Sequence, residues 1–334
     1  MRFLAIPLLF VALFSDSLSP VPPDVQDLQQ FYAPPSRIHF FDAQGDFHWR
    51  PFTYRAELVD PLDGLYRELK DQPHDLELFC AGYPYRFLGL VPTTRHLIGT
   101  RAEGVFHPWG TDDLGRDVMA RALAGARSSL LVLFTGIAVY FLIGVGIGGI
   151  AGMLGGWIDA LLMRFSEFVL ALPALYLVLA VRLILPPQMP AWQTVLITAG
   201  TIAAITWPPL ARGVRGVILQ VRNAGYVDAS RSLGATRMHV FRRHLLPALT
   251  PFALAQTAVA APVFILGEVI LSFLNVGFHD SAVSWGTMLR NLRDPRVITD
   301  FWWNLAPLAL VFITLLCLAG FSSRMHVKEP AQLA

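Results

Sequence analysis

Long apolar runs constrain this chain more than any other feature, because about 20 consecutive apolar residues are enough to cross a bilayer. Such runs lie within Ser129–Leu154, Trp192–Leu210, Pro251–Leu274 and Leu305–Phe321. The chain is 54% hydrophobic with a mean hydropathy of +0.50, which excludes an ordinary soluble protein. Since a backbone inside lipid must satisfy its own hydrogen bonds, we expect an all-α polytopic membrane protein.

The expected organisation is a first transmembrane helix at residues 1–19 and a transmembrane domain at residues 110–324, with about six spans in all. Phe3–Phe14 is short for a span and a signal peptide is the alternative, but Ser17–Pro20 is a poor cleavage site, which favours the span. Small residues in the second span allow neighbouring helices to approach closely. The five later spans are expected at about residues 128–154, 158–185, 192–212, 251–274 and 303–322.

Residues 20–109 are expected to lie outside the cytoplasm as a proline-rich linker followed by a small β-rich domain. Residues 38–49 alternate in polarity around a turn at Gln44 and Gly45, which predicts a β-hairpin. Residues 76–87 suggest a second hairpin. A domain of this size is near the lower limit for independent stability, so we expect it to rest on the membrane domain or on a partner.

The segment Arg222–Pro247 lies between two spans but is basic, with Asp228 as its only acid. Basic loops between spans belong on the cytoplasmic side of the membrane. The pattern predicts a short helix over Tyr226–Leu233, with the acid near its positive end. A left-handed turn at Gly234 would stop that helix, and Thr236 would cap a second one.

The second helix is expected to carry Met238, Phe241 and Leu245 on one face, and Pro247 is expected to close the segment before the next span. Two short helices at a sharp angle would form a compact protrusion, which we interpret as a surface on which a cytoplasmic partner can push. The alternative is an amphipathic loop that lies on the lipid surface.

This segment resembles the cytoplasmic signature loop, the EAA loop, of permease subunits in bacterial binding-protein-dependent ABC importers. The family pattern is Glu-Ala-Ala, three residues, Gly, nine residues, an apolar residue, any residue, and Leu-Pro. The positions that match it here are Asp228, Ala229, Ser230, Gly234, Leu246 and Pro247. Asp and Ser are mild departures from Glu and Ala, and His244 replaces the usual apolar residue.

A second string, just before the second span, resembles the Gly-Thr-Asp-x-x-Gly-Arg-Asp lead-in of the dipeptide, oligopeptide and nickel branch of these permeases. By its own chemistry, the string predicts that Thr111 or Asp112 caps the next helix and that Asp117 pairs with Arg121 on its exposed face. The matching positions are Gly110, Thr111, Asp112, Gly115, Arg116 and Asp117.

A third string, in and after the fifth span, resembles the family's Glu-x-x-Leu-Ser-Phe-Leu-Gly-Leu-Gly and Ser-Trp-Gly strings. Asn275 stands where Gly is usual, which leaves the local helix packing open. The matching positions are Glu268, Leu271, Ser272, Phe273, Leu274, Gly277, Ser284, Trp285 and Gly286.

The resemblance implies a type I, MetI-like permease fold with a small β-rich extracytoplasmic insert. It implies a multi-pass protein of the bacterial plasma (inner) membrane, with both termini cytoplasmic and a tail at residues 325–334. The implied partners are a second homologous permease subunit, two ATP-binding ABC subunits and an extracytoplasmic solute-binding protein, within the lipid bilayer and without nucleic acid. Peptides are the default cargo.

Neither lysine of the chain, Lys70 or Lys328, follows a glycine, so no Gly-Lys-Ser/Thr phosphate-binding loop exists here. If ATP drives the protein, a separate chain hydrolyses it, and we expect no catalytic residue or cofactor. The aspartates at 112–117 lack the alternating ligands and late Glu of a calcium loop, so we expect no metal site.

Polar residues inside the spans are functional candidates, since charges are costly in lipid. Arg164 and Glu167 lie one turn apart in the third span, and Glu268 lies within the fifth. We favour pairing of Glu268 with an arginine such as Arg182, or its protonation, because no chain of acids and histidines for a proton relay is evident.

Two other classes of protein stay open. An ion-gradient-driven secondary transporter or channel predicts several intramembrane acids along a path and often inverted repeats. A membrane-anchored structural or receptor protein has no need of a structured basic loop. Only the importer predicts that an ATPase co-purifies in fixed stoichiometry.

Overall fold

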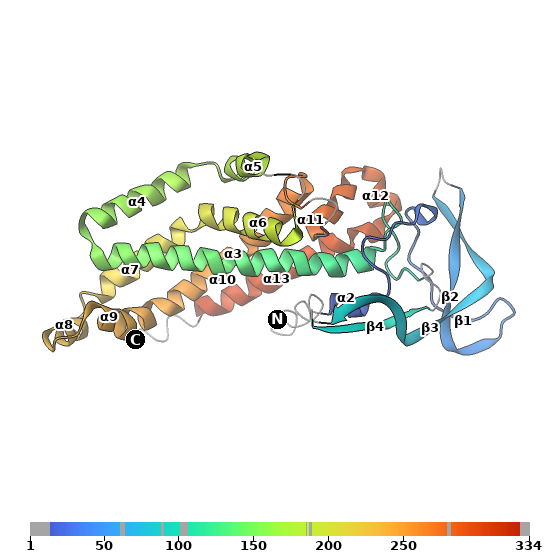
Figure 1. Ribbon diagram of the computed structural model, residues 1–334, viewed down its shortest axis with the longest axis horizontal. Helices are drawn as coiled ribbons and strands as arrows, with labels where there is room; N and C mark the ends of the chain where they lie inside the picture. Colours follow the sequence, from blue (N-terminus) through green and yellow to red (C-terminus); the bar gives the residue numbers. More distant parts are fainter. Residues whose placement is uncertain are drawn as a thin grey trace. The chain divides into compact units, whose positions relative to one another are not determined.

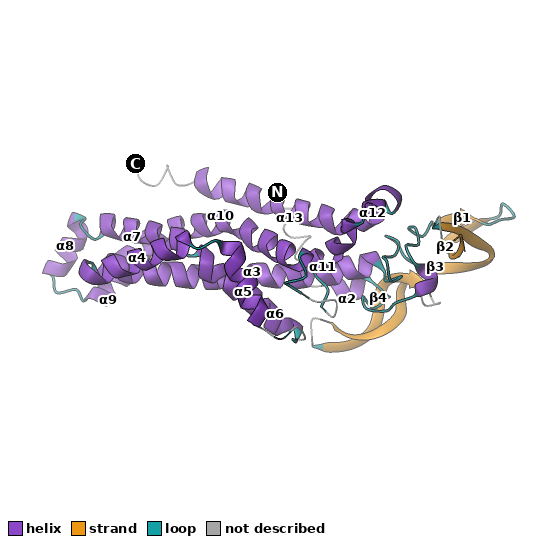
Figure 2. Cartoon of the chain, turned by 90° about the horizontal axis from the view of Figure 1, so that it is seen from above, coloured by secondary structure: helices purple, strands orange, loops and turns teal. Residues whose placement is uncertain are grey.

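The computed structural model describes residues 14–60, 64–87, 90–100, 106–184, 186, 189–278 and 282–327. The chain separates into two compact units. The helical unit is built mainly from Leu131–Glu268 with the chain from Leu315 onward, and the sheet unit from Phe3–Leu130 with Val269–Thr314. Figure 1 labels the elements and Figure 2 colours them by type.

Within the described residues, three helices are long and apolar enough to cross a membrane. They are α3 (Val118–Leu154), a helix over Met238–Phe273 that includes α10 (Leu246–Phe273), and a helix over Trp302–Ser323 that includes most of α13 (Ala306–Val327). A fourth span is possible if α6 (Ala191–Thr206) and α7 (Pro208–Val221), which meet at a 51° bend, count as one. The chain is therefore mostly helical, but the expected number of about six spans is not confirmed.

Two further spans were expected from the sequence, at residues 1–19 and at residues 158–185. The span expected at residues 1–19 falls largely on residues 1–13, which lie outside the described residues; within the described part, Ser15–Leu18 forms a short helix, α2. The span expected at 158–185 is broken into α4 (Gly156–Ala171) and α5 (Ala174–Ile184). Pro173 causes the break, because a residue before proline avoids the helical region, and Leu172 is indeed extended with ψ 132°.

Close helix packing in the helical unit depends on the small residues of α3, as predicted. A Cβ added at Gly136 would lie 2.3 Å from the ring of Phe264, and one at Gly148 would lie 2.3 Å from the carbonyl oxygen of Ala211. Neither distance is sterically allowed, so a side chain at either glycine would force α3 away from α10 or α7. The apolar surfaces of these helices can meet only because the glycines leave room.

The sheet unit contains four antiparallel strands in the order β1 (His39–Phe41), β2 (Phe47–Asp60), β3 (Leu65–Phe87) and β4 (Val91–Thr100). The first predicted hairpin is confirmed, with its turn between β1 and β2 and Gly45 at φ 92°. A β-rich insert is thus present before the long helices.

The second predicted hairpin is wrong. β3 continues through Gly82 as one strand and pairs with β4, with only a register shift between Ala81 and Tyr85. Gly82 is needed for close packing and not for a turn, because a Cβ there would lie 2.6 Å from the ring of His96. Both ring nitrogens of that buried histidine contact backbone oxygens, at 2.8 Å from Asp16 and 3.0 Å from Tyr83.

Short elements complete the sheet unit beside the start of α3. They are η1 (Leu28–Gln30), α11 (Trp285–Met288), η3 (Leu289–Arg293), α12 (Pro295–Asp300) and η4 (Trp302–Leu305). Buried residues of α11, α12 and η4, and of the segments beside these elements, share one apolar core with the first turns of α3. That core contains Tyr32, Val118, Ala122, Val283, Met288, Val297 and Trp303.

Candidate functional site

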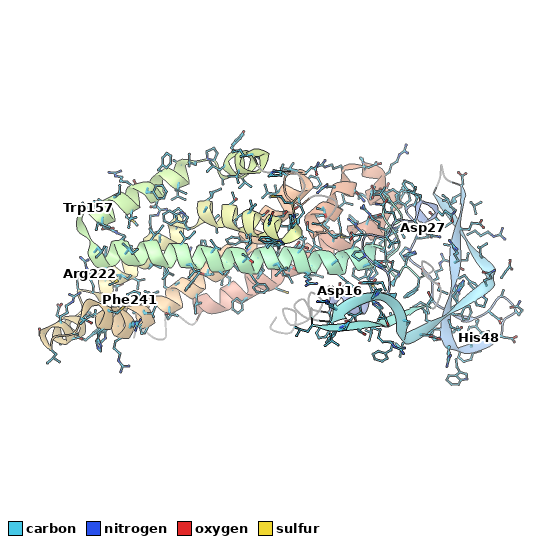
Figure 3. All side chains as sticks on the ribbon, viewed as in Figure 1. Asp16, Asp27, His48, Trp157, Arg222 and Phe241 are labelled. Carbon is cyan, nitrogen blue, oxygen red and sulfur yellow. The ribbon has the colours of Figure 1, made fainter. Side chains whose placement is uncertain are left out.

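The basic segment of the helical unit begins with α7, which two arginines fasten to neighbouring helices. The guanidinium of Arg215 donates two hydrogen bonds, of 2.5 and 2.6 Å, to both carboxylate oxygens of Asp159 on α4. Arg222, labelled in Figure 3, donates to the carbonyl oxygen of Gly152 in the last turn of α3 at 2.9 Å. Sequence reasoning counted both arginines only as positive charges, because partners 56 and 70 residues away leave no local signal.

The first predicted helix of the segment is confirmed as α8 (Gly225–Ser232). Asp228 lies in its first turn, where a negative charge is favourable, and contacts Arg231 at 3.3 Å on the exposed surface. Gly234 has φ 87°, the predicted left-handed conformation. The N–H of Gly234 donates to the carbonyl of Arg231 and that of Ala235 donates to Ser230, which satisfies the end of the helix.

The second helix begins as predicted, with the hydroxyl of Thr236 accepting a bond from the N–H of His239 at 3.3 Å. Its expected end at Pro247 is wrong. α9 (Arg237–Val240) passes through a π-helical turn, η2 (Phe241–Leu245), straight into α10, so that Met238–Phe273 forms one helix. The wider turn, in which Leu246 bonds to Phe241 five residues earlier, precedes the proline that has no N–H to donate.

The surface of α8 and α9 differs from the expected amphipathic pattern. Val240 and Leu245 are buried, whereas Met238 is 56% exposed and belongs to a shallow surface depression with Arg242 and Arg243. On α8, Leu233 is 90% exposed. We name this surface, residues 225–243, the loop surface. It combines exposed apolar side chains with arginines, a composition typical of a protein–protein contact.

His244, the departure from the family pattern, has a structural explanation. Its ring lies 5.6 Å from that of Tyr226, so it joins the second helix to α8. Aromatic pairs at this separation attract each other. Figure 1 shows α8 and α9 side by side at the end of α7, and Figure 2 shows the same arrangement from a second direction.

The lead-in string, in the sheet unit, forms a tight turn that only glycine permits at two positions. Gly110 and Gly115 have φ values of 67° and 68°. A Cβ on Gly115 would lie 1.7 Å from the carbonyl oxygen of Asp27, and one on Gly110 would lie 2.5 Å from that of Ala33. Both glycines therefore combine a left-handed backbone with close contact to the segment before the sheet.

The charged residues of the lead-in form hydrogen bonds and ion pairs that differ from the predicted ones. The carboxylate of Asp112 accepts bonds from the backbone of Leu114 and Arg116 at 3.0 Å and pairs with the Arg116 guanidinium at 2.8 Å. Asp113 accepts a bond from Asn291 at 2.7 Å. Burial, and secondly the charge of Asp112, raise the pKa of the Asp113 carboxyl.

The predicted helix cap and surface ion pair are both wrong. α3 begins at Val118, and its cap is Asp117, whose carboxylate accepts from the N–H of Ala120 at 2.7 Å. Asp117 is 1% exposed and pairs with His107 at 2.8 Å, and Arg121 is 2% exposed and lies 3.4 Å from Asp112. The i, i+4 rule describes exposed helix surfaces, and tertiary partners replace it here.

Thr111 joins three parts of the sheet unit. Its hydroxyl accepts from the N–H of Ala33 at 2.7 Å and donates to the carbonyl of Gln30. Its own carbonyl accepts from the indole N–H of Trp303 at 3.0 Å. The lead-in string therefore connects the segment before the sheet, the start of α3 and η4, which precedes α13.

The Ser-Trp-Gly string packs against the same start of α3. Ser284 caps α11, with the reciprocal bonds of a capping box to Thr287. Trp285 is fully buried, and its indole N–H donates to the carbonyl of Ala122 at 3.0 Å. Asn275 has φ 64°, which explains why it can replace glycine, since asparagine tolerates the left-handed region.

Of the intramembrane candidates, Arg164 and Glu167 form an ion pair at 3.1 Å, with exposed side chains. Glu268 is fully buried in α10. Its suggested partner, Arg182, has a side chain outside the described part of the structure. No group of three or more His, Cys, Asp or Glu that could hold a metal occurs among the described residues.

Apolar helices long enough to span a bilayer, with a structured basic loop before one of them, are the features of a helical membrane protein. Residues 144–328, just over half of the 334-residue chain, match the family described as the binding-protein-dependent transport system inner membrane component. The chain belongs to this family. The resemblance inferred from its three strings is therefore confirmed.

Similar proteins include peptide permeases. The dipeptide transport system permease protein DppC of Bacillus subtilis is 39% identical over 199 residues, which are 60% of this chain and 60% of the relative. The oligopeptide transport system permease protein OppC of the same organism is 34% identical over 224 residues, 67% and 71% of the two chains. A chain of the MetNI methionine ABC transporter, solved in inward-facing conformations, is 16% identical with a TM-score of 0.47, over 61% of this chain and 94% of that one.

Proposed function

We propose that this chain is the permease subunit of an ATP-driven importer and lines the path of peptides or similar small solutes across the membrane. The observation that carries this proposal is the loop surface, which exposes apolar and basic side chains on a helix–turn–helix between spans. The names of the relatives favour dipeptides and oligopeptides as cargo. ATP hydrolysis is assigned to separate subunits, because the chain has no Gly-Lys sequence.

The loop surface is proposed to transmit force from those subunits into the membrane. α9, η2 and α10 form one continuous helix. A displacement of the loop surface would therefore move the buried part of α10 directly. On the other side, Arg215 and Arg222 fasten α7 to α4 and α3. ATP binding would favour one permease conformation through contacts that differ between conformations, and several kcal/mol are needed for a complete shift.

The proposed topology places the loop surface and both termini in the cytoplasm of a bacterial inner membrane, with residues 20–109 outside. We propose six spans in total, with the membrane domain at residues 110–324, the loop at 213–250 and the tail at 325–334. The proposed partners are a second, homologous permease chain in a heterodimer, two ATP-binding subunits and an extracytoplasmic solute-binding protein.

The force-transmission role is tested by Gly234→Val, with Gly216→Val on α7 as the matched control. A Cβ meets nothing within 4 Å at either glycine, but only Gly234 has a positive φ. The first variant strains the turn by roughly 1–3 kcal/mol, and the second leaves the backbone unstrained. We expect Gly234→Val and Asp228→Lys to abolish ATP-driven dipeptide uptake in reconstituted vesicles, with normal membrane assembly and near-normal uptake in the control. Undiminished uptake by both loop variants would contradict the role.

The rival function, an ion-gradient-driven transporter or channel, is not favoured by the family to which the chain belongs. Affinity purification of the tagged chain from native membranes separates the two. We expect an ATPase in fixed stoichiometry, and uptake that stops when ATP is removed while the ion gradient is kept. Uptake that follows the gradient without nucleotide would favour the rival.

A further inference from the structure

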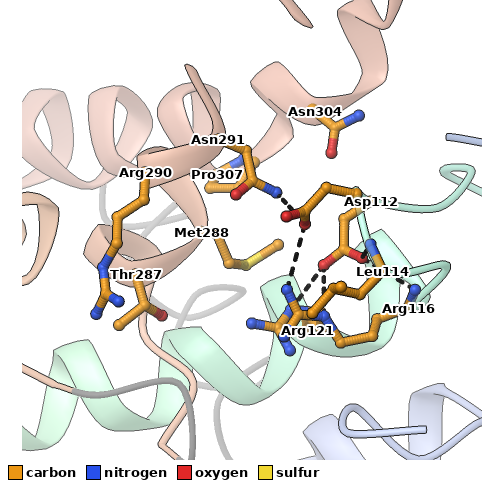
Figure 4. A pocket seen from close by; sticks show the side chains of 11 residues that line it. Asp112, Leu114, Arg116, Arg121, Thr287, Met288, Arg290, Asn291, Asn304 and Pro307 are labelled. Atoms are coloured by element: carbon orange, nitrogen blue, oxygen red, sulfur yellow. Dashed lines mark hydrogen bonds and ion pairs between the residues drawn. The ribbon is translucent and has the colours of Figure 1, made fainter. Parts of the chain in front are cut away.

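A polar cavity of about 190 Å³ lies in the sheet unit beside the lead-in string. Figure 4 shows its side chains, with Asp112, Leu114, Arg116 and Arg121 on one side and Thr287 and Arg290 on the other. The volume exceeds by far what one water molecule needs, so a small molecule or chemical group can enter. Neither the loop surface nor the family resemblance assigns any role to this cavity.

The cavity wall contains a buried donor that has no acceptor. Arg121 is 2% exposed, and its Nε–H makes no hydrogen bond within the described structure. The atom lies 3.4 Å from the carboxylate oxygen of Asp112 that accepts from Arg116 at 2.8 Å, and this ion pair between Arg121 and Asp112 is not a hydrogen bond. A buried donor without an acceptor is costly, and such groups commonly mark the place of a bound ion or molecule.

The charge of the wall indicates which acceptor would be favourable. Three guanidinium groups and two carboxylates line the cavity, which leaves a formal excess of one positive charge among its described residues. Guanidinium groups bind planar carboxylates with particular strength, because their N–H groups match the two oxygens. We propose that this cavity binds a carboxylate group, with the Nε–H of Arg121 as a principal donor.

Binding of [14C]acetate to the full-length chain in lipid nanodiscs, measured by equilibrium dialysis at pH 7 and constant ionic strength, tests the proposal. Arg121→Gln removes the donor, and Leu114→Trp fills the cavity without changing its charge. Arg127→Gln is the control, since Arg127 lies on the same helix, is 58% exposed and does not line the cavity. We expect both cavity variants to bind acetate at least about tenfold more weakly, and the control to bind as the unaltered chain does.

Absence of saturable acetate binding by the unaltered chain, as expected if the cavity holds only water, would overturn the proposal. Equal affinity in all three variants would also overturn it. If Arg121→Gln fails to fold, Leu114→Trp alone decides, because it leaves every ion pair of the wall in place. None of these measurements uses ATP or transport, so their outcome is independent of the proposed function.

Two competitors identify the source of the carboxylate. Ala-Ala carries a free C-terminal carboxylate, and Ala-Ala-amide has the same backbone without it. Displacement of acetate by Ala-Ala alone would assign the site to a peptide terminus. Saturable acetate binding that neither competitor displaces would assign it to a small free carboxylate, which also satisfies the proposal.

Discussion

The lead-in string and the loop surface both match family patterns at several positions, but the matching residues are buried in the lead-in and mostly exposed on the loop surface. In the lead-in, Thr111, Asp112 and Asp117 are buried and bonded to residues of the same unit. On the loop surface, Asp228 makes one exposed ion pair and Leu233 projects almost fully from the chain. The internal packing of this chain thus explains the lead-in residues but not those of the loop surface, for which a partner outside the chain is proposed.

The largest effect should come from the packing that the lead-in shares with the Ser-Trp-Gly string. Trp285→Ala leaves a cavity at a fully buried site and removes the indole bond to Ala122. We expect the free energy of unfolding to fall by about 3–5 kcal/mol. Trp302→Ala is the matched control, since that ring is 62% exposed, and should cost far less. Denaturant titration in detergent micelles measures both, and equal losses would contradict the comparison.

Two glycines with the same backbone conformation give a sharper test. Gly115 and Gly234 have φ values of 68° and 87°, so alanine strains the backbone at both. Only at Gly115 does a Cβ also collide, 1.7 Å from the oxygen of Asp27. We expect Gly115→Ala to cost roughly 2–5 kcal/mol, from strain plus overpacking, and Gly234→Ala about 1 kcal/mol.

Thermal unfolding of the two alanine variants, compared with the unaltered chain in the same micelles, measures this difference. If the proposed function holds, the effects of the two variants on ATP-driven uptake should follow the opposite order from their effects on stability. Gly234→Ala should then reduce ATP-driven uptake more than its small cost in stability explains. A Gly115→Ala variant as stable as Gly234→Ala would show that the segment around Asp27 yields easily, and the lead-in would not be rigid.

Local patterns were enough to predict the first helix of the loop, its turn and the start of its second helix, because their determinants lie within a few residues of one another. The short helix, the left-handed Gly234 and the Thr236 cap all depend on neighbouring backbone groups. The first hairpin was predictable for the same reason, since Gly45 and its flanking alternation are adjacent. Such features carry their own signal in the sequence.

Features that depend on distant partners were missed. Asp117 and Arg121 have the spacing of a surface pair, yet His107 and Asp112 draw them into the interior. The second hairpin was expected over residues 76–87, which include Gly82, yet this glycine makes room for the ring of His96 on the adjacent strand. In each case a tertiary contact outweighs a local preference, and one sequence without a structure does not reveal the partner.

The break between α4 and α5 is a different kind of error, because its cause was visible. Pro173 lies within the expected third span, and a proline inside a helix removes a hydrogen bond and disturbs the preceding residue. The apolar composition on both sides favoured one long helix, and hydropathy alone does not register the missing N–H. The span count therefore depends on a residue that composition treats as neutral.

The smallest expected effect distinguishes two aspartates that both lie near a helix start. Asp117→Ala removes the cap of α3 and the buried partner of His107, so we expect a loss of about 2–3 kcal/mol in unfolding free energy. Asp228→Ala removes only a favourable helix-dipole contact and an exposed pair with Arg231, and we expect a loss below about 1 kcal/mol.

Raised salt discriminates further, because exposed charges are screened and buried ones much less. The small cost of Asp228→Ala should nearly vanish in 1 M sodium chloride, whereas the cost of Asp117→Ala should persist. Denaturant titrations at low and high salt give both differences from the same two variants. A large, salt-resistant cost at Asp228 would mean that the loop surface is stabilised from within the chain, and the need for an external partner to explain its residues would disappear.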